Sequence, residues 1–384
     1  MSAADSEQAL ADSGEGALPE GLACVYPLGT QLGPGGRLEI GGCDASELAR
    51  EFGTPAYVYA EDDMRVRARA VLEAFAARRA DCEVLYASKA FPCTAALTLF
   101  AAAGLSCDVA SGGELALALG AGFAARRIHV HGNNKSEDEL EQALEAGVGH
   151  VIVDSFDELD RLAVLAGGSG QRVLVRVNPG IDSGTHAKIA TGQEDSKFGI
   201  PTALVPAAAE RCAAAGLDLR GLHAHVGSQV FDLDVYDRLG EVLGGLGDFP
   251  TIDVGGGFAA AYTRDQRPPT ADAYAEAMLR ALPYGVRVLC EPGRSLVANA
   301  GVTLYTVGTV KEVPGVRTYV AVDGGMADNI RPMLYGAEYE ADLAERVGDG
   351  EQLQRRPAAA RCLLPRRRRA RRGPPGDVRR LDRP

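Results

Sequence analysis

The sequence predicts an α/β fold, a closed (β/α)8 TIM-type barrel joined to a second β-rich domain that both chain ends build and that is truncated at its C-terminus. Three observations predict it. Eight short apolar segments alternate with alanine-rich helical stretches, and polar or glycine residues follow each apolar segment. After Gly293 this alternation ends, and the segments that follow have the residue pattern of β-strands.

The barrel prediction rests on the order of the segments. The predicted strands are Glu83–Ala87, Leu105–Val109, Arg127–His131, His150–Asp154, Arg172–Asn178, Gly221–Val226, Thr251–Val254 and Arg287–Cys290. Helical stretches such as Thr94–Ala103, Gly113–Leu119, Glu137–Ala146 and Phe156–Leu165 lie between them. Eight strand–helix repeats favour a closed parallel barrel over an open sheet.

The remaining segments divide the chain into domains. We expect 1–37 to be disordered, because its first twenty residues are small, polar and acidic. Residues 38–57 would start the β-rich domain, 58–285 would form the barrel, and 286–350 would add the last barrel strand and the incomplete C-terminal β-rich part. The β-type runs there are Gly301–Thr309, Thr318–Val322 and the approach to Tyr335. Residues 351–384, with 12 Arg and five Pro, cannot form a packed core and should be disordered.

Charge and composition exclude several classes of protein. The net charge of the 384 residues is −12, and the part before residue 351 carries 28 basic and 49 acidic residues. An acidic body argues against nucleic acid or an anionic membrane as partner. No apolar stretch is long enough to cross a bilayer, and the acidic start is unlike a signal peptide, so we expect a cytoplasmic protein. Eight cysteines without a C-x-x-C pair indicate reduced thiols.

The candidate site lies at the carboxyl ends of the strands, where barrel enzymes place their chemistry. Lys89 ends the first strand, and desolvation there should lower its pKa and make it a competent nucleophile, unless its side chain simply reaches solvent. Gly255, Gly256 and Gly257 follow the seventh strand and could bring backbone N–H groups close to a phosphate, or form a flexible turn. Glu291 and Arg294 end the eighth strand and could bind a cofactor or form a structural ion pair.

Histidines raise a rival interpretation. His129 and His131 alternate on one strand and His223 and His225 on another, so a metal-dependent barrel hydrolase is an alternative. Such enzymes typically begin with His-x-His on strand one and end with Asp on strand eight, where this chain has Lys89 and Glu291. We therefore expect no metal, and we expect His225 to stack on a flat ring.

Taken together, these segments resemble diaminopimelate decarboxylase, a member of the fold-type III, alanine-racemase-like family that depends on pyridoxal 5′-phosphate. The resemblance covers about residues 38–340. Its motifs are YASKA from Tyr86, DVASGGE from Asp108, HGNNKS from His131, SKFG from Ser196, GLHAHVGSQ from Gly221, DVGGG from Asp253, EPGR from Glu291 and IRPMLY from Ile330.

The resemblance implies a role for each candidate residue. Lys89 would hold the cofactor covalently, His225 would stack on its ring, and Glu291 would bind its pyridine nitrogen. The phosphate would be held by Ser228, Gly255, Gly256, Gly257, Gly293 and Arg294, and Pro292 would also belong to the cofactor site. Arg294, Arg331 and Tyr335 would contact the amino-acid substrate. The reaction implied is decarboxylation of meso-2,6-diaminopimelate to L-lysine and CO2, in lysine biosynthesis, by a homodimer.

The sequence departs from the family near its end. Family members continue into a Cys-Glu-Ser-Gly-Asp motif, whose Cys gives a proton in the partner's site, and a later Gly-Ala-Tyr, and neither occurs here. A shifted reading frame in GC-rich coding sequence would produce such an Arg- and Pro-rich tail, with a genuine basic arm as the alternative. We therefore expect that this chain could be inactive.

Two other functions remain, and a third is disfavoured. A related decarboxylase of ornithine, arginine or carboxynorspermidine would share most motifs, although the Arg331–Tyr335 segment argues against it. A non-catalytic protein that binds pyridoxal phosphate is the alternative from another class. Alanine racemase is disfavoured, because it pairs the pyridine nitrogen with Arg, whereas the eighth strand here offers Glu291.

Overall fold

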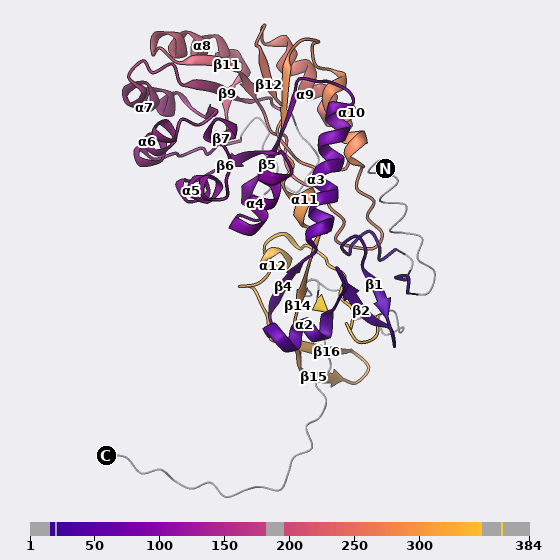
Figure 1. The fold of residues 1–384 in the computed structure, drawn as a ribbon. Coiled ribbons are helices and arrows are strands. Elements are labelled where there is room, and N and C mark those ends of the chain that lie inside the picture. The colour runs from indigo at the N-terminus through magenta and orange to yellow at the C-terminus, as the bar shows by residue number, and fades with distance from the viewer. Residues whose placement is uncertain (1–15, 20, 182–195, 348–361, 364–384) are drawn as a thin grey trace, which may run out of the picture.

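The computed structural model describes residues 16–19, 21–181, 196–347 and 362–363. A closed barrel surrounded by helices forms one part, and a smaller β-rich part lies beside it (Figure 1). No helix in these ranges is long and apolar enough to cross a membrane. Seven cysteines are free thiols: Cys24, Cys43, Cys82, Cys93, Cys107, Cys212 and Cys290.

The barrel has eight parallel strands in the predicted order. They are β5 (Cys82–Ala87), β6 (Ser106–Val109), β7 (Ile128–Val130), β8 (His150–Val153), β9 (Arg172–Asn178), β11 (Asp218–His223), β12 (Thr251–Asp253) and β13 (Arg287–Cys290). Pairing of β8 with β9 and of β13 with β5 closes the ring. A short strand, β10 (Ile200–Pro201), adds to β9. The barrel prediction is confirmed, with strand bounds that differ from the predicted ones by at most three residues.

Helices surround this ring and cover its outer surface (Figure 1). They are α3 (Glu61–Ala76), α4 (Thr94–Ala102), α5 (Gly112–Gly120), α6 (Glu137–Ala146), α7 (Phe156–Ala166), α8 (Val205–Ala214), α9 (Asp234–Gly245) and α10 (Ala271–Arg280). Short turns of 3-10 helix lie at Ser88–Ala90, Ala125–Arg127 and Thr202–Leu204. Helix α6 shows how the sequence sets the bounds: Ser136 and Glu139 form a capping box, and Gly147 ends the helix in the left-handed region.

Inside the barrel, side chains form layers, because alternate residues of each strand point inward. The middle layer is an apolar cluster of Leu85, Ile152, Leu174 and Leu289, all buried. One polar layer lies on the side of the strands' carboxyl ends and another on the side of their amino ends. The apolar layer therefore separates the two ends of the barrel.

The β-rich part is built from both sides of the barrel sequence. Strand β4 (Ala56–Tyr59) precedes the barrel and pairs antiparallel with β14 (Gly301–Leu304), which follows it. The other elements are β1 (Gln31–Gly33), β2 (Arg37–Ile40), β3 (Cys43–Asp44), α2 (Ala45–Phe52), α11 (Arg294–Val297), β15 (Val307–Val313), β16 (Arg317–Val322), α12 (Arg331–Tyr335) and β17 (Cys362–Leu363). Leu22, Leu38 and Ile40 share a core with Val302 and Leu304, so both sides of the barrel sequence supply this part.

Two expectations are wrong. The first is the predicted disorder of residues 1–37, because Leu22, Val25 and Tyr26 are buried in the core of the β-rich part. Positions 1–15 and 20 lie outside the described residues. The approach to Tyr335 is the helix α12, which Pro332 at its start and the left-handed Gly336 at its end favour. Of the predicted disordered tail 351–384, only Cys362–Leu363 is described, as a strand that pairs with β14.

Candidate active site

The lysine predicted to be the nucleophile stands at the carboxyl end of the barrel. Lys89 lies in the short turn that follows β5, and its Nζ is 2.9 Å from Oδ2 of Asp108 on the neighbouring strand β6. Desolvation lowers the pKa of Lys89, but the charges of Asp108 and Glu291 outweigh it, so its pKa is raised. The expected lowering of this pKa is therefore wrong, because two carboxylates stabilise the ammonium ion.

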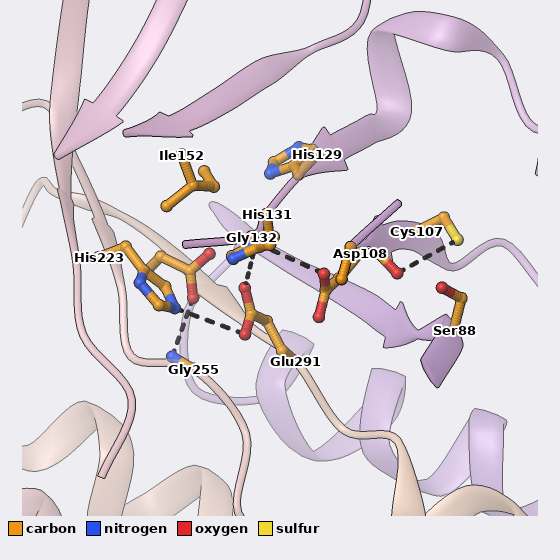
Figure 2. Close-up of polar contacts among 12 residues, drawn as sticks. Ser88, Cys107, Asp108, His129, His131, Gly132, Ile152, His223, Gly255 and Glu291 are labelled. Carbon is orange, nitrogen blue, oxygen red and sulfur yellow. Dashed lines mark hydrogen bonds and ion pairs between the residues drawn. The ribbon is translucent and has the colours of Figure 1, made fainter. Parts of the chain in front are cut away.

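The carboxylate at the end of β13 lies in the centre of the same barrel end. Buried Glu291 has His131 Nε2 at 2.8 Å and His223 Nε2 at 3.5 Å (Figure 2). Burial raises the pKa of Glu291, but the two imidazoles more than offset it and hold the pKa well below its usual range. Burial and the charge of Glu291 raise the pKa of neighbouring Asp253 well above its ordinary value. Within this buried pair, the two neighbouring imidazoles therefore favour the negative charge on Glu291 rather than on Asp253.

Several buried polar atoms around Glu291 have no hydrogen-bond partner among the described residues. They are Oδ1 of Asp108, Nδ1 of His223 and Oδ2 of Asp253, whereas Nε2 of His131 and Nε2 of His223 face Glu291 at the distances given above. Buried groups normally find partners, so this cluster fits a further polar group, such as a protonated ring nitrogen, at Glu291. His131, His223, Asp253 and Glu291 also have ligand atoms within 4.8 Å of one another, which suits a metal ion.

The three glycines form a tight loop after β12. Gly255 and Gly257 have φ values of +67° and +109°, and a Cβ on Gly256 would lie 2.2 Å from the carbonyl oxygen of Glu291. The amide of Gly255 donates to Asp253 Oδ1, and that of Gly256 donates to His225 Nδ1 at 3.1 Å. This loop therefore fixes the half-buried His225 beside the end of β13. Burial lowers the pKa of His225 well below its usual value, so the ring is neutral.

A chain of contacts links the barrel to the β-rich part. Arg294 donates through Nε and Nη2 to Ser228 Oγ and through Nη1 to the hydroxyl of Tyr262 at 2.7 Å. The guanidinium of Arg331, at the start of α12, lies 4.4 Å above the ring of Tyr262 and also contacts Tyr339. Arg294 and Arg331, far apart in sequence, thus flank one tyrosine.

The structure brings most predicted site residues to one end of the barrel, and it adds others. Pro292 and Gly293 sit against β5, where the Pro292 carbonyl accepts from the Ala87 amide and a Cβ on Gly293 would lie 2.9 Å from that of Ala87. Tyr335 ends α12, one turn after Arg331, and is half-buried.

Four residues around the site were given no role in cofactor or substrate binding from the sequence: Asp108, His131, Tyr262 and Tyr339. Strand-end position and alternation could have indicated Asp108 and His131, whereas no sequence signal marks the two tyrosines. His225 was expected on a strand, but β11 ends at His223, which is the histidine that faces Glu291.

Comparison with known proteins agrees with this geometry. Residues 61–298 match the family model of the pyridoxal-dependent decarboxylase, pyridoxal binding domain. The chain is 46% identical over 336 residues to diaminopimelate decarboxylase of Bacillus subtilis, covering 82% of this chain and 76% of that protein. It is 41% identical to the protein of that name from Mycobacterium tuberculosis, covering 88% and 82%.

Solved structures give the same result. Diaminopimelate decarboxylase from Helicobacter pylori complexed with L-lysine superposes with a TM-score of 0.70 at 33% identity, over 77% of each chain. The enzyme of that name from M. jannaschii in co-complex with L-lysine gives 0.76 at 30% identity, over 86% of this chain and 83% of that one. With a barrel that places Lys89, Glu291 and the glycine loop together, and with these relatives, the chain belongs to the pyridoxal-dependent decarboxylase family.

Proposed function

We propose that the chain acts on meso-2,6-diaminopimelate and releases L-lysine and CO2. The observation that carries the proposal is the pairing of Arg294 and Arg331 around Tyr262, on the end of the barrel that also holds Lys89 and Glu291. The names of the relatives, and the lysine in two related structures, support this choice of substrate.

The cofactor of this family is pyridoxal 5′-phosphate, and when bound it supplies an electron sink for the carbanion that loss of CO2 leaves. Lys89 would hold its aldehyde carbon. Glu291, kept ionised by His131 and His223, would hold a proton on the ring nitrogen. The neutral ring of His225, oriented by the Gly256 amide, would pack against the cofactor's face.

The phosphate would lie among Ser228, the glycine loop and the Gly293–Arg294 turn. Within the loop, the amides of Gly255 and Gly256 already donate to protein atoms. A phosphate contact from the loop is therefore best supplied by Gly257. Arg294 would provide a charge-assisted donor to an anion, with Ser228 beside it.

Arg331 has no role in holding the cofactor, and the second carboxylate of the substrate gives it one. Diaminopimelate has an amino-acid group at each end, and only one loses CO2. Arg331 would bind the carboxylate of the retained end, with Arg294 and Tyr335 beside it. Ornithine and lysine have no second carboxylate, so a related decarboxylase of those amino acids would gain nothing from Arg331.

The partner proposed is a second copy of the chain. Large apolar side chains are exposed on α12 and in the segments beside it: Tyr57, Met326, Ile330, Met333 and Leu334. Apolar side chains that gather on a surface in this way mark an interaction site. Their closeness to Arg331 supports a homodimer whose interface borders the active site.

The test is CO2 release by protein loaded with pyridoxal phosphate, with meso-diaminopimelate, L-lysine, L-ornithine and L-arginine compared. We expect release from meso-diaminopimelate alone, and we expect Arg331→Gln to raise the concentration of meso-diaminopimelate that gives a half-maximal rate of the first turnover. Faster release from ornithine or arginine would replace this proposal with the related decarboxylase. A requirement for a metal, shown by loss of activity in EDTA, would favour the four-residue cluster around Glu291 as a metal centre.

A further inference from the structure

A second pocket lies at the other end of the barrel, where the strands begin. It has a volume of about 400 Å³, within the range of small-molecule sites. Its wall comes from the amino ends of several strands, with Glu83 on β5, Arg172 on β9 and Arg287 on β13. The residues proposed for catalysis lie at the opposite ends of the same strands.

The lining of this pocket is strongly basic. Five arginines contribute to it: Arg126, Arg127, Arg172, Arg220 and Arg287. Glu83 is the one acidic residue in the lining; it binds Arg287 at 2.7 Å, and outside the lining Asp218 lies 3.7 Å from Arg220. The side chains of Arg126 and Arg172 have no hydrogen bond or ion pair with another described residue. Since the chain as a whole is acidic, this concentration of positive charge is a local feature.

A buried histidine adds a donor or acceptor to the wall. His129 is 1% exposed, and its Nδ1 has no hydrogen-bond partner among the residues described. Its Nε2 faces His150 Nδ1 at 3.4 Å and Glu83 at 3.8 Å. Burial lowers the pKa of His129 to about 4 and that of His150 to about 3, so both rings are neutral. A neutral imidazole can still donate one N–H to an anion.

This pocket is separate from the active site. The apolar layer of Leu85, Ile152, Leu174 and Leu289 fills the barrel between them. From Glu83 to Ala87, one strand spans about 13 Å at 3.3 Å per residue, and Lys89 lies beyond that. A ligand in the basic pocket would therefore touch neither Lys89 nor Glu291.

We propose that the amino end of the barrel is a second binding site, for a small metabolite with phosphate or paired carboxylate groups. Arg126 and Arg172 would be its main contacts, because neither is engaged by a described residue. Arg127, Arg220 and Arg287 would add positive charge, and His129 would supply a hydrogen bond from the wall. Bidentate guanidinium contacts suit both kinds of anion.

The test is calorimetric titration of protein already loaded with pyridoxal phosphate, so that the cofactor's own phosphate site is filled. Inorganic phosphate and succinate are the probes, at constant ionic strength with chloride. We expect saturable binding of at least one probe, and a loss of tenfold or more in affinity in the double variant Arg126→Gln, Arg172→Gln. Comparison of the two probes separates phosphate from dicarboxylate recognition.

The matched control is Arg211→Gln, which removes an exposed arginine that pairs with Asp160 on the barrel's outer surface. It should bind the probes as wild type does. Thermal unfolding of each variant checks the fold, and Arg220→Gln replaces the double variant if that one unfolds. No saturable binding of either probe, or equal affinity in the variants that remove pocket arginines, would overturn the proposal.

Discussion

At the scale of single residues, the ion pair of Lys89 with Asp108 decides how the cofactor is loaded. A protonated amine cannot attack an aldehyde, and the two nearby carboxylates raise the pKa of Lys89. We expect the rate of pyridoxal phosphate binding, followed by its visible absorbance, to increase as the pH rises from neutral. Borohydride should then fix the cofactor on Lys89. A trapped peptide that contains Lys135 or Lys311 instead would refute the assignment, and Lys89→Ala should trap nothing.

Glu291 makes a different contribution, because it acts on the cofactor's electronics rather than on its attachment. An amide cannot keep a ring nitrogen protonated as an ionised carboxylate does. Glu291→Gln should therefore bind pyridoxal phosphate, seen by absorbance, yet decarboxylate on the order of a hundredfold more slowly or worse. Glu47→Gln, at an exposed position, is the control. An undiminished first-turnover rate of CO2 release in Glu291→Gln would exclude this role.

Sequence reasoning found these residues because a parallel barrel brings all its strand ends together. Lys89, Glu291 and the three glycines follow apolar segments, and that position alone predicts their convergence. The contact of Arg331 with Tyr262 could not be predicted in the same way. It depends on how the β-rich part packs on the barrel, which no local pattern specifies. The predicted lowering of the pKa of Lys89 was wrong for a similar reason. The carboxylate that raises this pKa belongs to Asp108, which lies on a different strand.

At the scale of elements, the loop after β12 tolerates no side chain at its centre. A Cβ on Gly256 would lie 2.2 Å from the carbonyl oxygen of Glu291, so either the loop or the end of β13 must move. We expect Gly256→Ala to lower stability by about 1–3 kcal/mol and to weaken cofactor binding, measured by thermal unfolding and by absorbance titration.

Gly245→Ala is the matched control for that variant. Gly245 is the last residue of α9, and a Cβ there meets nothing within 4 Å. Alanine should leave stability unchanged or raise it by roughly 0.5–1 kcal/mol, because it restricts the unfolded chain. Equal melting temperatures for the two variants would show that the loop after β12 adapts easily.

At the scale of the whole molecule, the barrel carries the residues proposed here for the release of CO2, but the given sequence has no Cys-Glu-Ser-Gly-Asp motif to supply the proton. Loss of CO2 needs no proton, whereas completion of the product does. We expect about one CO2 per cofactor in a rapid first turnover, followed by little or no steady release, measured by rapid-quench assay. Sustained turnover from the first cycle onward would mean that another group returns the proton.

The antiparallel pairing of β4 with β14 also orders events during synthesis. Ala56–Tyr59 leaves the ribosome early, but its partner Gly301–Leu304 emerges only after every barrel strand has been made. Strand β4 therefore lacks its partner β14 while more than half of the protein is translated. During that time its unpaired edge can pair with other chains. Closure of the barrel brings Ala56–Tyr59 and Gly301–Leu304 together. The β-rich part can therefore assemble only after the barrel has folded.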